Sequence, residues 1–212
     1  MTEIKLAHQE DLKRIAECHC AAFPDSLSSA LGLVYVKVML GWYLFNENTF
    51  LFFIEEKGKC LGYCGGMVKK VWGVGSASSM AQYSFNAASI GFLRKPWLIF
   101  HPEVRMKFPF ILKNIVNRVI RKGKLKGEPS VIFEPYAGLV VIGVDTEYQR
   151  KGYGSMLLNQ FEKISIERGL KKIILSVRSD NEQAIKSYAR NGWKITEVNA
   201  KSTSMEKTIN SN

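Results

Sequence analysis

An apolar run that ends in a basic glycine turn constrains this chain more than any other stretch. Residues 139–144 are apolar and rich in β-branched side chains, which is typical of a buried strand. The turn that follows reads Gln-Arg-Lys-Gly-Tyr-Gly over residues 149–154, and helical spacing begins after it. Glycines allow a ligand to approach the backbone, and the first turn of a helix offers unpaired N–H groups. Because Arg150 and Lys151 add positive charge, the arrangement predicts a site for an anion such as a pyrophosphate.

A second motif further along the chain links this turn to a known family. Gln149, Gly152 and Gly154 match the pattern Q/R-x-x-G-x-G/A, and another apolar strand is expected over residues 171–177. The positions that then follow in order are Ser179, Asp180, Asn181, Ala184, Tyr188, Gly192 and Trp193. With both motifs in this order, the chain resembles the GNAT family of N-acetyltransferases. The resemblance covers the last eighty or so residues well and the first seventy or so loosely.

The resemblance implies an α/β (α+β) fold, with a mixed, mainly antiparallel twisted sheet and helices on both faces. A length of 212 residues with 46% apolar content is enough for one such domain, which we expect to span residues 1–212. Local patterns predict strand 4–6, helix 8–23, a helical region 26–44, strands 49–55 and 60–68 joined by turn 56–59, helix 152–168, strand 171–177, helix 182–191, and a final pair, 193–198 and 201–207.

Residues 72–130 depart from the family pattern, because they form an insertion between the third and fourth strands. Residues 73–89 are rich in Gly, Ser and Ala and predict a loop with a short helix, whereas residues 109–122 predict a basic amphipathic helix. Between residues 93 and 128, ten Lys and Arg oppose two Glu. The insertion therefore carries +8 of the formal net charge of +11.

Three interpretations of the insertion remain open. It is a lid over the acceptor groove, a site for an anionic acceptor such as a nucleotide-linked amino sugar, or an attachment to an anionic membrane surface. A nucleic-acid partner is not expected, since no nucleic-acid-binding module accompanies the charge.

The resemblance implies acetyl-CoA as the acetyl donor. In that arrangement the Ile142 N–H contacts the thioester carbonyl, and Val144 pairs with the pantetheine arm. Gly143 between them suggests close approach of the cofactor. Asn181 caps the next helix, bonds the pantetheine arm, or does both. The remaining expected cofactor-binding residues are Gln149, Arg150, Lys151, Gly152, Tyr153, Gly154 and Ser155.

The catalytic roles are expected to fall on an acid and a base. By resemblance, Tyr188 protonates the departing thiolate, and a phenol with a pKa of about 10 is in the donor form at neutral pH. The family's strand-four carboxylate has no counterpart here, because Gly138 holds its position. Glu134 is the preferred base, with Tyr136 and His101 as alternatives. A water path, or an acceptor that arrives neutral, would need no base.

The predicted function is an acetyl-CoA-dependent N-acetyltransferase that acts on the primary amine of a small molecule, with an amino sugar or its nucleotide-linked form favoured. The alternatives are acetylation of a peptide or protein amino terminus, and a non-catalytic acyl-CoA sensor, for which the argument is Gly138. We expect a cytoplasmic monomer or homodimer, since the first residues do not read as a signal peptide and residues 31–45 are too short for a comfortable membrane span.

No metal is expected. The cysteine spacings do not match paired zinc knuckles, and they predict reduced structural thiols. On a helix Cys18, His19 and Cys20 would point to different faces, so His19 is expected to be a packing residue.

Overall fold

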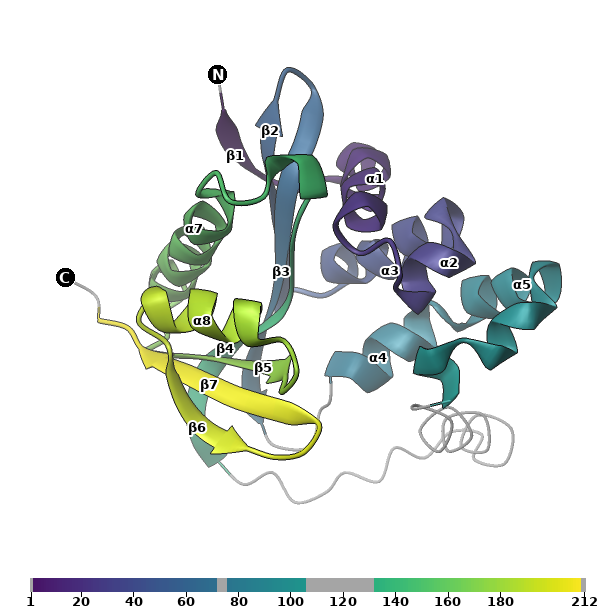
Figure 1. Ribbon diagram of the computed structural model, residues 1–212. Coiled ribbons are helices and arrows are strands. Elements are labelled where there is room, and N and C mark those ends of the chain that lie inside the picture. Colours follow the sequence, from purple (N-terminus) through teal and green to yellow (C-terminus); the bar gives the residue numbers. More distant parts are fainter. Residues whose placement is uncertain (1, 72–75, 106–131, 211–212) are drawn as a thin grey trace.

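Seven strands form one sheet in the computed structural model, which describes residues 2–71, 76–105 and 132–210 (Figure 1). The order is β1-β2-β3-β4-β5-β7-β6, and neighbours are antiparallel except for the parallel pair β4 and β5. The predicted mixed, mainly antiparallel sheet is therefore confirmed. The strands are β1 (Glu3–Leu6), β2 (Thr49–Glu56), β3 (Lys59–Val71), β4 (Ile132–Val144), β5 (Lys172–Arg178), β6 (Lys194–Val198) and β7 (Ser202–Thr208).

Helices cover both faces of the sheet, as Figure 1 shows. One face carries α7 (Tyr153–Glu167) and α8 (Glu182–Arg190), and the other carries α1 (Leu12–Ala22) and α3 (Leu33–Phe45). Strand β2 shows why two cores form. Phe52 and Ile54 join the core under α7, whereas Leu51 and Phe53 join the core under α1 and α3. Side chains alternate between the faces of a strand, so a strand covered on both faces is apolar throughout.

The glycines of β3 admit large aromatic side chains into both cores. A Cβ at Gly66 would lie 2.4 Å from Phe50 and 2.6 Å from Phe161, and a Cβ at Gly65 would lie 2.6 Å from Tyr43. Glycine is therefore required at both positions, because aromatic rings occupy the space that a side chain would need.

Residues with positive φ angles form the turn between β2 and β3 and the break within the helical region before β2. Lys57 and Gly58, between β2 and β3, both have positive φ angles, 49° and 80°, as a type I′ hairpin turn requires. The helical region predicted over residues 26–44 is confirmed. Gly32, with φ of 103°, divides it into α2 (Leu27–Leu31) and α3.

The described part of the insertion is largely helical. It contains α4 (Ser76–Tyr83), α5 (Phe85–Arg94) and the 3₁₀ helix η2 (Pro96–Phe100). A loop with a short helix was predicted over residues 73–89. Within the described residues 76–89 the prediction underestimated the helix, because small residues tolerate helix when packing supports it. The amphipathic helix predicted over residues 109–122 lies outside the described residues.

The insertion holds both ends of α2. The Lys95 Nζ donates to the Ala30 carbonyl at 2.7 Å, and the Glu103 carboxylate accepts from the Leu27 N–H at 2.9 Å. A cation at the carboxyl end and an anion at the amino end both suit the helix dipole. Because a Cβ at Gly91 would lie 2.7 Å from Leu31, α5 also packs closely on this helix.

Among the described helices, none combines the length and apolar character that crossing a bilayer would require.

Candidate active site

Strands β4 and β5 separate into a wedge. Their register pairs only residues 137–139 with residues 173–175. Beyond this point β4 continues beside β3, and residues 176–178 of β5 continue beside β7. The facing edges of β4 and β5 are therefore open over residues 140–144 and 176–178. Backbone N–H and C=O groups on such edges need other partners, and an extended ligand can supply them.

A bulge in β4 marks the start of the wedge. Gly65 lies opposite Val141 and Gly66 lies opposite Leu139, so Val140 has no partner in β3. A bulge bends the strand and increases its twist, which accounts for the divergence from β5 directly after Leu139. Sequence reasoning missed this feature, because the apolar run carries no local sign of an extra residue.

The two residues expected to contact the thioester lie within the wedge. Ile142 lies opposite Cys64, and Val144 lies opposite Gly62. Both are half-buried and pack against the core under α7 and α8. Their position on the open edge is what the predicted roles require.

Gly143 has a different explanation from the one that the sequence suggested. A Cβ there would lie 2.8 Å from Phe23, 3.0 Å from Tyr63 and 3.2 Å from Ala22. Packing of α1 and β3 side chains against the opposite face therefore requires glycine, and cofactor approach is not needed to explain it.

The glycine turn presents an uncapped helix end. Gly152 is the N-cap of α7 with φ of 86°, and no side chain caps the helix. By contrast, the Ser26 side chain caps α2 and the Asn181 side chain caps α8. The N–H groups of the first turn, from Tyr153 onward, are therefore available for an anion.

Gly154 gives independent support for a ligand at this turn. A Cβ there would meet no heavy atom within 4 Å, and Gly154 is not among the glycines with positive φ. Neither packing nor backbone conformation requires glycine at this position. Close approach of a ligand to the helix end would require it.

Charged and polar side chains complete the turn. Arg150 and Lys151 are exposed, and Arg150 adopts a left-handed conformation with φ of 61°. The Lys151 Nζ lies 5.0 Å from the centre of the Tyr148 ring. The Gln149 side chain donates to the Val144 carbonyl at 3.1 Å, which ties the turn to the end of β4.

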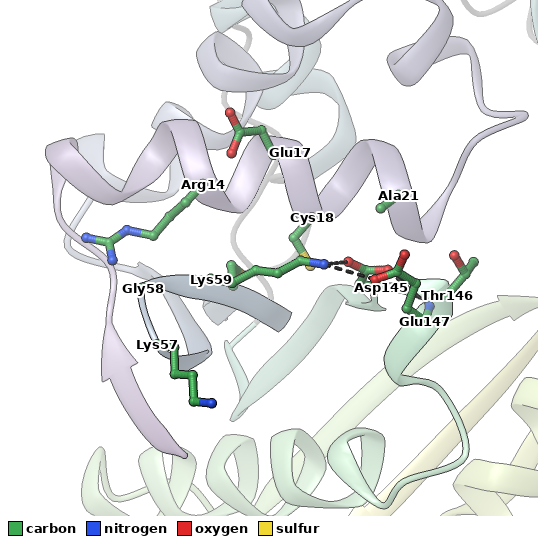
Figure 2. A pocket seen from close by; sticks show the side chains of 11 residues that line it. Arg14, Glu17, Cys18, Ala21, Lys57, Gly58, Lys59, Asp145, Thr146 and Glu147 are labelled. Carbon is green, nitrogen blue, oxygen red and sulfur yellow. Dashed lines mark hydrogen bonds and ion pairs between the residues drawn. The ribbon is translucent and has the colours of Figure 1, made fainter. Parts of the chain in front are cut away.

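A pocket of about 520 Å³ lies beside the 3₁₀ helix η3 (Thr146–Tyr148) that leads into this turn. Figure 2 shows Lys59 extending across it toward Asp145 and Glu147. The Lys59 Nζ lies 3.1 Å from Asp145 and 3.2 Å from Glu147, and these hydrogen bonds raise the Lys59 pKa. Since the Asp145 carboxylate is buried, this cation supplies its counter-charge and holds η3.

Tyr188 is buried on α8, on the face of the sheet that carries α7. Burial, with a smaller contribution from Cys64, raises the pKa of Tyr188 to about 12. Tyr188 and Cys64, the residue opposite Ile142, belong to the same core, and Ile142 packs against that core. The hydroxyl forms no hydrogen bond with any part of the chain that the structure describes.

Asn181 has the structural role that was expected of it. Its side-chain oxygen accepts from the Ala184 N–H at 3.1 Å and so caps α8. Beside it, Arg178 and Asp180 form an ion pair at the open end of β5. The structure therefore brings Ile142, Asn181 and the glycine turn to the two sides and the end of one wedge.

Glu134 is not brought to this wedge. It is exposed near the start of β4, eight residues before Ile142. At about 3.3 Å per residue the two lie about 25 Å apart, too far for proton transfer from an amine held at Ile142. We therefore expect Glu134→Gln to leave kcat and its pH profile unchanged within about twofold in steady-state assays. Selective loss of kcat near neutral pH would instead restore the predicted base.

A buried polar chain on the opposite face was missed by sequence reasoning. The His19 Nδ1 lies 2.5 Å from the Tyr63 hydroxyl, and its Nε2 lies 2.8 Å from the Ser28 Oγ, which in turn bonds Ser26. Burial lowers the pKa of His19 to about 4, so the imidazole is neutral at pH 7. The predicted packing role of His19 is confirmed. Only the fold shows that β3 and α2 supply its partners.

The lowered pKa of His19 predicts that the stability of the fold depends on pH. The unfolded chain binds a proton near pH 6.5, whereas the folded chain resists it until about pH 4. Stability is therefore complete above pH 6.5 and falls as the pH drops toward 4, by on the order of 3 kcal/mol. Urea unfolding at several pH values measures this slope. His19→Gln should flatten it and His8→Gln should not, and an equal slope in both variants would contradict the assignment.

The four cysteines are free thiols. A hydrogen bond with the Cys18 thiol, together with burial, raises the pKa of Cys60. Within the described ranges, no cluster of three His, Cys, Asp or Glu side chains could hold a metal ion.

Comparisons with known proteins agree with this geometry. The model of a family described as the acetyltransferase (GNAT) family matches residues 12–193. PaiA N-acetyltransferase from Thermoplasma acidophilum, solved with coenzyme A, superposes with a TM-score of 0.56 over 98% of this chain and 99% of that chain, at 14% identity. The Escherichia coli ribosomal-protein-S18-alanine N-acetyltransferase superposes with a TM-score of 0.53 over 100% of this chain and 96% of that chain, at 17% identity.

A comparison of sequences gives a further similarity. Over 62 residues the chain is 36% identical to mycothiol acetyltransferase from Corynebacterium aurimucosum. The aligned segment is 29% of this chain and 20% of that protein. It therefore compares one part of each molecule.

Proposed function

Since the chain belongs to the acetyltransferase (GNAT) family, we propose that it transfers an acetyl group from acetyl-CoA to the primary amine of a small molecule. The observation that carries the proposal is the wedge between β4 and β5, together with the uncapped amino end of α7, whose turn is tied to the end of β4 by Gln149. An extended thiol arm fits open strand edges, and a pyrophosphate fits a helix end. Coenzyme A joins both chemical features in one molecule.

The chain's own groups have distinct roles in this reaction. Acetyl-CoA supplies a thioester, whose carbon–sulfur bond breaks as the carbon–nitrogen bond forms. The Ile142 N–H would stabilise negative charge on the carbonyl oxygen, and Val144 would align the thiol arm. Tyr188 would donate its proton to the departing sulfur. An acceptor that arrives as the neutral amine still loses one proton as the amide forms. That proton would leave through water, and the Tyr188 phenolate would regain a proton from solvent, so no dedicated carboxylate is needed.

The residues of the glycine turn would hold the pyrophosphate. The first-turn N–H groups of α7 face the anion, and Arg150 and Lys151 contribute charge. Gln149 would act indirectly, because its side chain fixes the turn to Val144. Asn181 would act in the same indirect way by ordering the start of α8.

An amino sugar or its nucleotide-linked form is the acceptor that we favour. The support is the basic insertion, which contributes Lys95 beside α2 and the exposed Arg94 and Arg105. A diphosphate would be recognised by such cations. The fold alone does not choose an acceptor, since structural neighbours include enzymes named for ribosomal-protein-S18-alanine and for phosphinothricin.

A panel assay tests the proposal. Release of free thiol from acetyl-CoA would be followed with simple amines, amino sugars, nucleotide-linked amino sugars and peptides with free amino termini. Turnover on amino sugars, faster with the linked nucleotide, is the expected result. Preference for peptides would establish the alternative protein substrate. Acetyl-CoA binding with no turnover on any member would instead identify a sensor and overturn the proposal.

A further inference from the structure

Helix α5 and η2 carry a dense group of exposed apolar side chains, which we call the insertion face. It consists of Ile90, Leu93, Trp97, Ile99 and Phe100. Their exposed fractions are 49%, 82%, 62%, 55% and 74%. Five large apolar side chains exposed within one short segment indicate an interaction surface, whereas single exposed apolar residues need no explanation.

We infer that the insertion face docks the protein on an anionic membrane surface. This inference goes beyond acetyl transfer. It draws on cations that also support a phosphate-bearing acceptor, and the vesicle test decides it separately from the panel assay. Figure 1 shows α5 at the side of the molecule farthest from α7. Docking there would leave the glycine turn accessible.

The insertion face is exposed because the rest of the same segment is anchored. Leu98 and Val104 are buried, and Gly91 packs on Leu31. Lys95 donates to the end of α2, so the segment cannot turn its apolar side chains inward without breaking these contacts. The apolar face is therefore presented by a fixed support.

The positive charge of this segment favours an anionic lipid surface over a second copy of the chain as the binding partner. Residues 84–105 contain Arg94, Lys95 and Arg105 against a single acid, Glu103, whose carboxylate accepts from the Leu27 N–H on α2. A chain with a net charge of +11 repels its own copies and is attracted to anionic headgroups. Aromatic residues such as Trp97 suit the boundary between headgroups and acyl chains.

Vesicle sedimentation of the full chain tests the inference. Vesicles of phosphatidylcholine with about 30% phosphatidylserine should retain the protein, and pure phosphatidylcholine should retain it far less. Each cation near the surface contributes about fivefold to binding, so raising the salt from about 0.05 to 0.5 M should release the protein.

Matched variants distinguish binding through the insertion face from nonspecific adsorption to vesicles. A triple variant, Leu93→Gln with Trp97→Gln and Phe100→Gln, should lower the partition coefficient at least about tenfold, because it removes three inserted apolar side chains. The control is Ile195→Gln with Val198→Gln on β6, two residues that are 53% and 64% exposed, and it should bind like the parent. Thermal melting would confirm that both variants fold.

Three results would overturn the inference. They are no retention by anionic vesicles, equal retention by neutral vesicles, and equal loss in the β6 variant. A concentration-dependent dimer in light scattering that disappears in the triple variant would assign the insertion face to a second copy instead.

Discussion

Replacing Tyr188 by Phe is expected to lower kcat by about 10²- to 10³-fold and to leave the Kd for acetyl-CoA unchanged within about twofold. The change removes one oxygen from a buried ring that packs against Trp193, with ring centres 6.1 Å apart, so the fold should persist. A general acid contributes to the transition state, in which the thiolate departs, and not to ground-state binding. Single-turnover kinetics and calorimetric titration with acetyl-CoA measure the two quantities separately.

The pH dependence gives the same residue a second test. Because burial raises the pKa of Tyr188 to about 12, its hydroxyl is in the donor form at every pH below that value. Loss of its proton would lower kcat only as the pH rises through about 12. The pH profiles of the parent and of Tyr188→Phe should therefore have the same shape between about pH 6 and 9, and differ only in height.

Tyr43→Phe is the matched control for this substitution. Its hydroxyl is also buried and has no hydrogen-bond partner within the described residues, but it belongs to the core under α1 and α3. Its removal should leave kcat unchanged and raise the free energy of unfolding by about 1 kcal/mol, since an unsatisfied buried polar group is removed. Comparable loss of kcat in both variants would exclude a specific role for Tyr188.

Gly154→Leu is expected to stabilise the protein and to weaken acetyl-CoA binding at least about 100-fold. A Cβ at this position meets no protein atom, and Leu is a better helix former than Gly by about 0.5–1 kcal/mol. The same side chain would occupy the space in which a pyrophosphate must approach the first turn of α7. Gly154→Ala should give the same gain in stability with a smaller loss of binding. Urea unfolding and titration with acetyl-CoA measure the opposing effects.

A truncated donor provides the control for the glycine turn. S-acetylpantetheine has no pyrophosphate, so its kcat/KM should be unaffected by Gly154→Leu. If both donors lose activity equally, the substitution has disturbed the wedge, and the turn is not the pyrophosphate site. If neither loses activity, the open space above Gly154 has no role in donor binding.

Local patterns predicted the elements that build the donor side. The strand, turn and helix around Gly152 follow from a β-branched run, two glycines and a change of period, which are properties of neighbouring residues. The cap at Asn181 is equally local, because a side chain reaches the N–H of a residue three positions on. Such features depend little on distant parts of the chain.

Other predictions failed where packing between distant segments determines the local structure or the position of a side chain. The sequence offered cofactor approach as the reason for Gly143, but Phe23 and Tyr63 from other elements occupy that space. The small residues of 73–89 predicted a loop with a single short helix, although residues from Phe85 onward form α5, which packs against α2. Glu134 seemed a suitable base by strand alternation, and only the length of β4 shows its distance from Ile142.

The sequence by itself determined the strand, glycine turn and helix of the donor side and the resemblance that identifies the donor, because periodicity, glycine conformation and helix capping act between near neighbours. Only the tertiary structure decided that β4 leaves β5 after Leu139, that His19 is held neutral between Tyr63 and Ser28, and that the insertion presents an apolar face. These features arise from contacts between residues far apart in the chain, whose free energies no local pattern records.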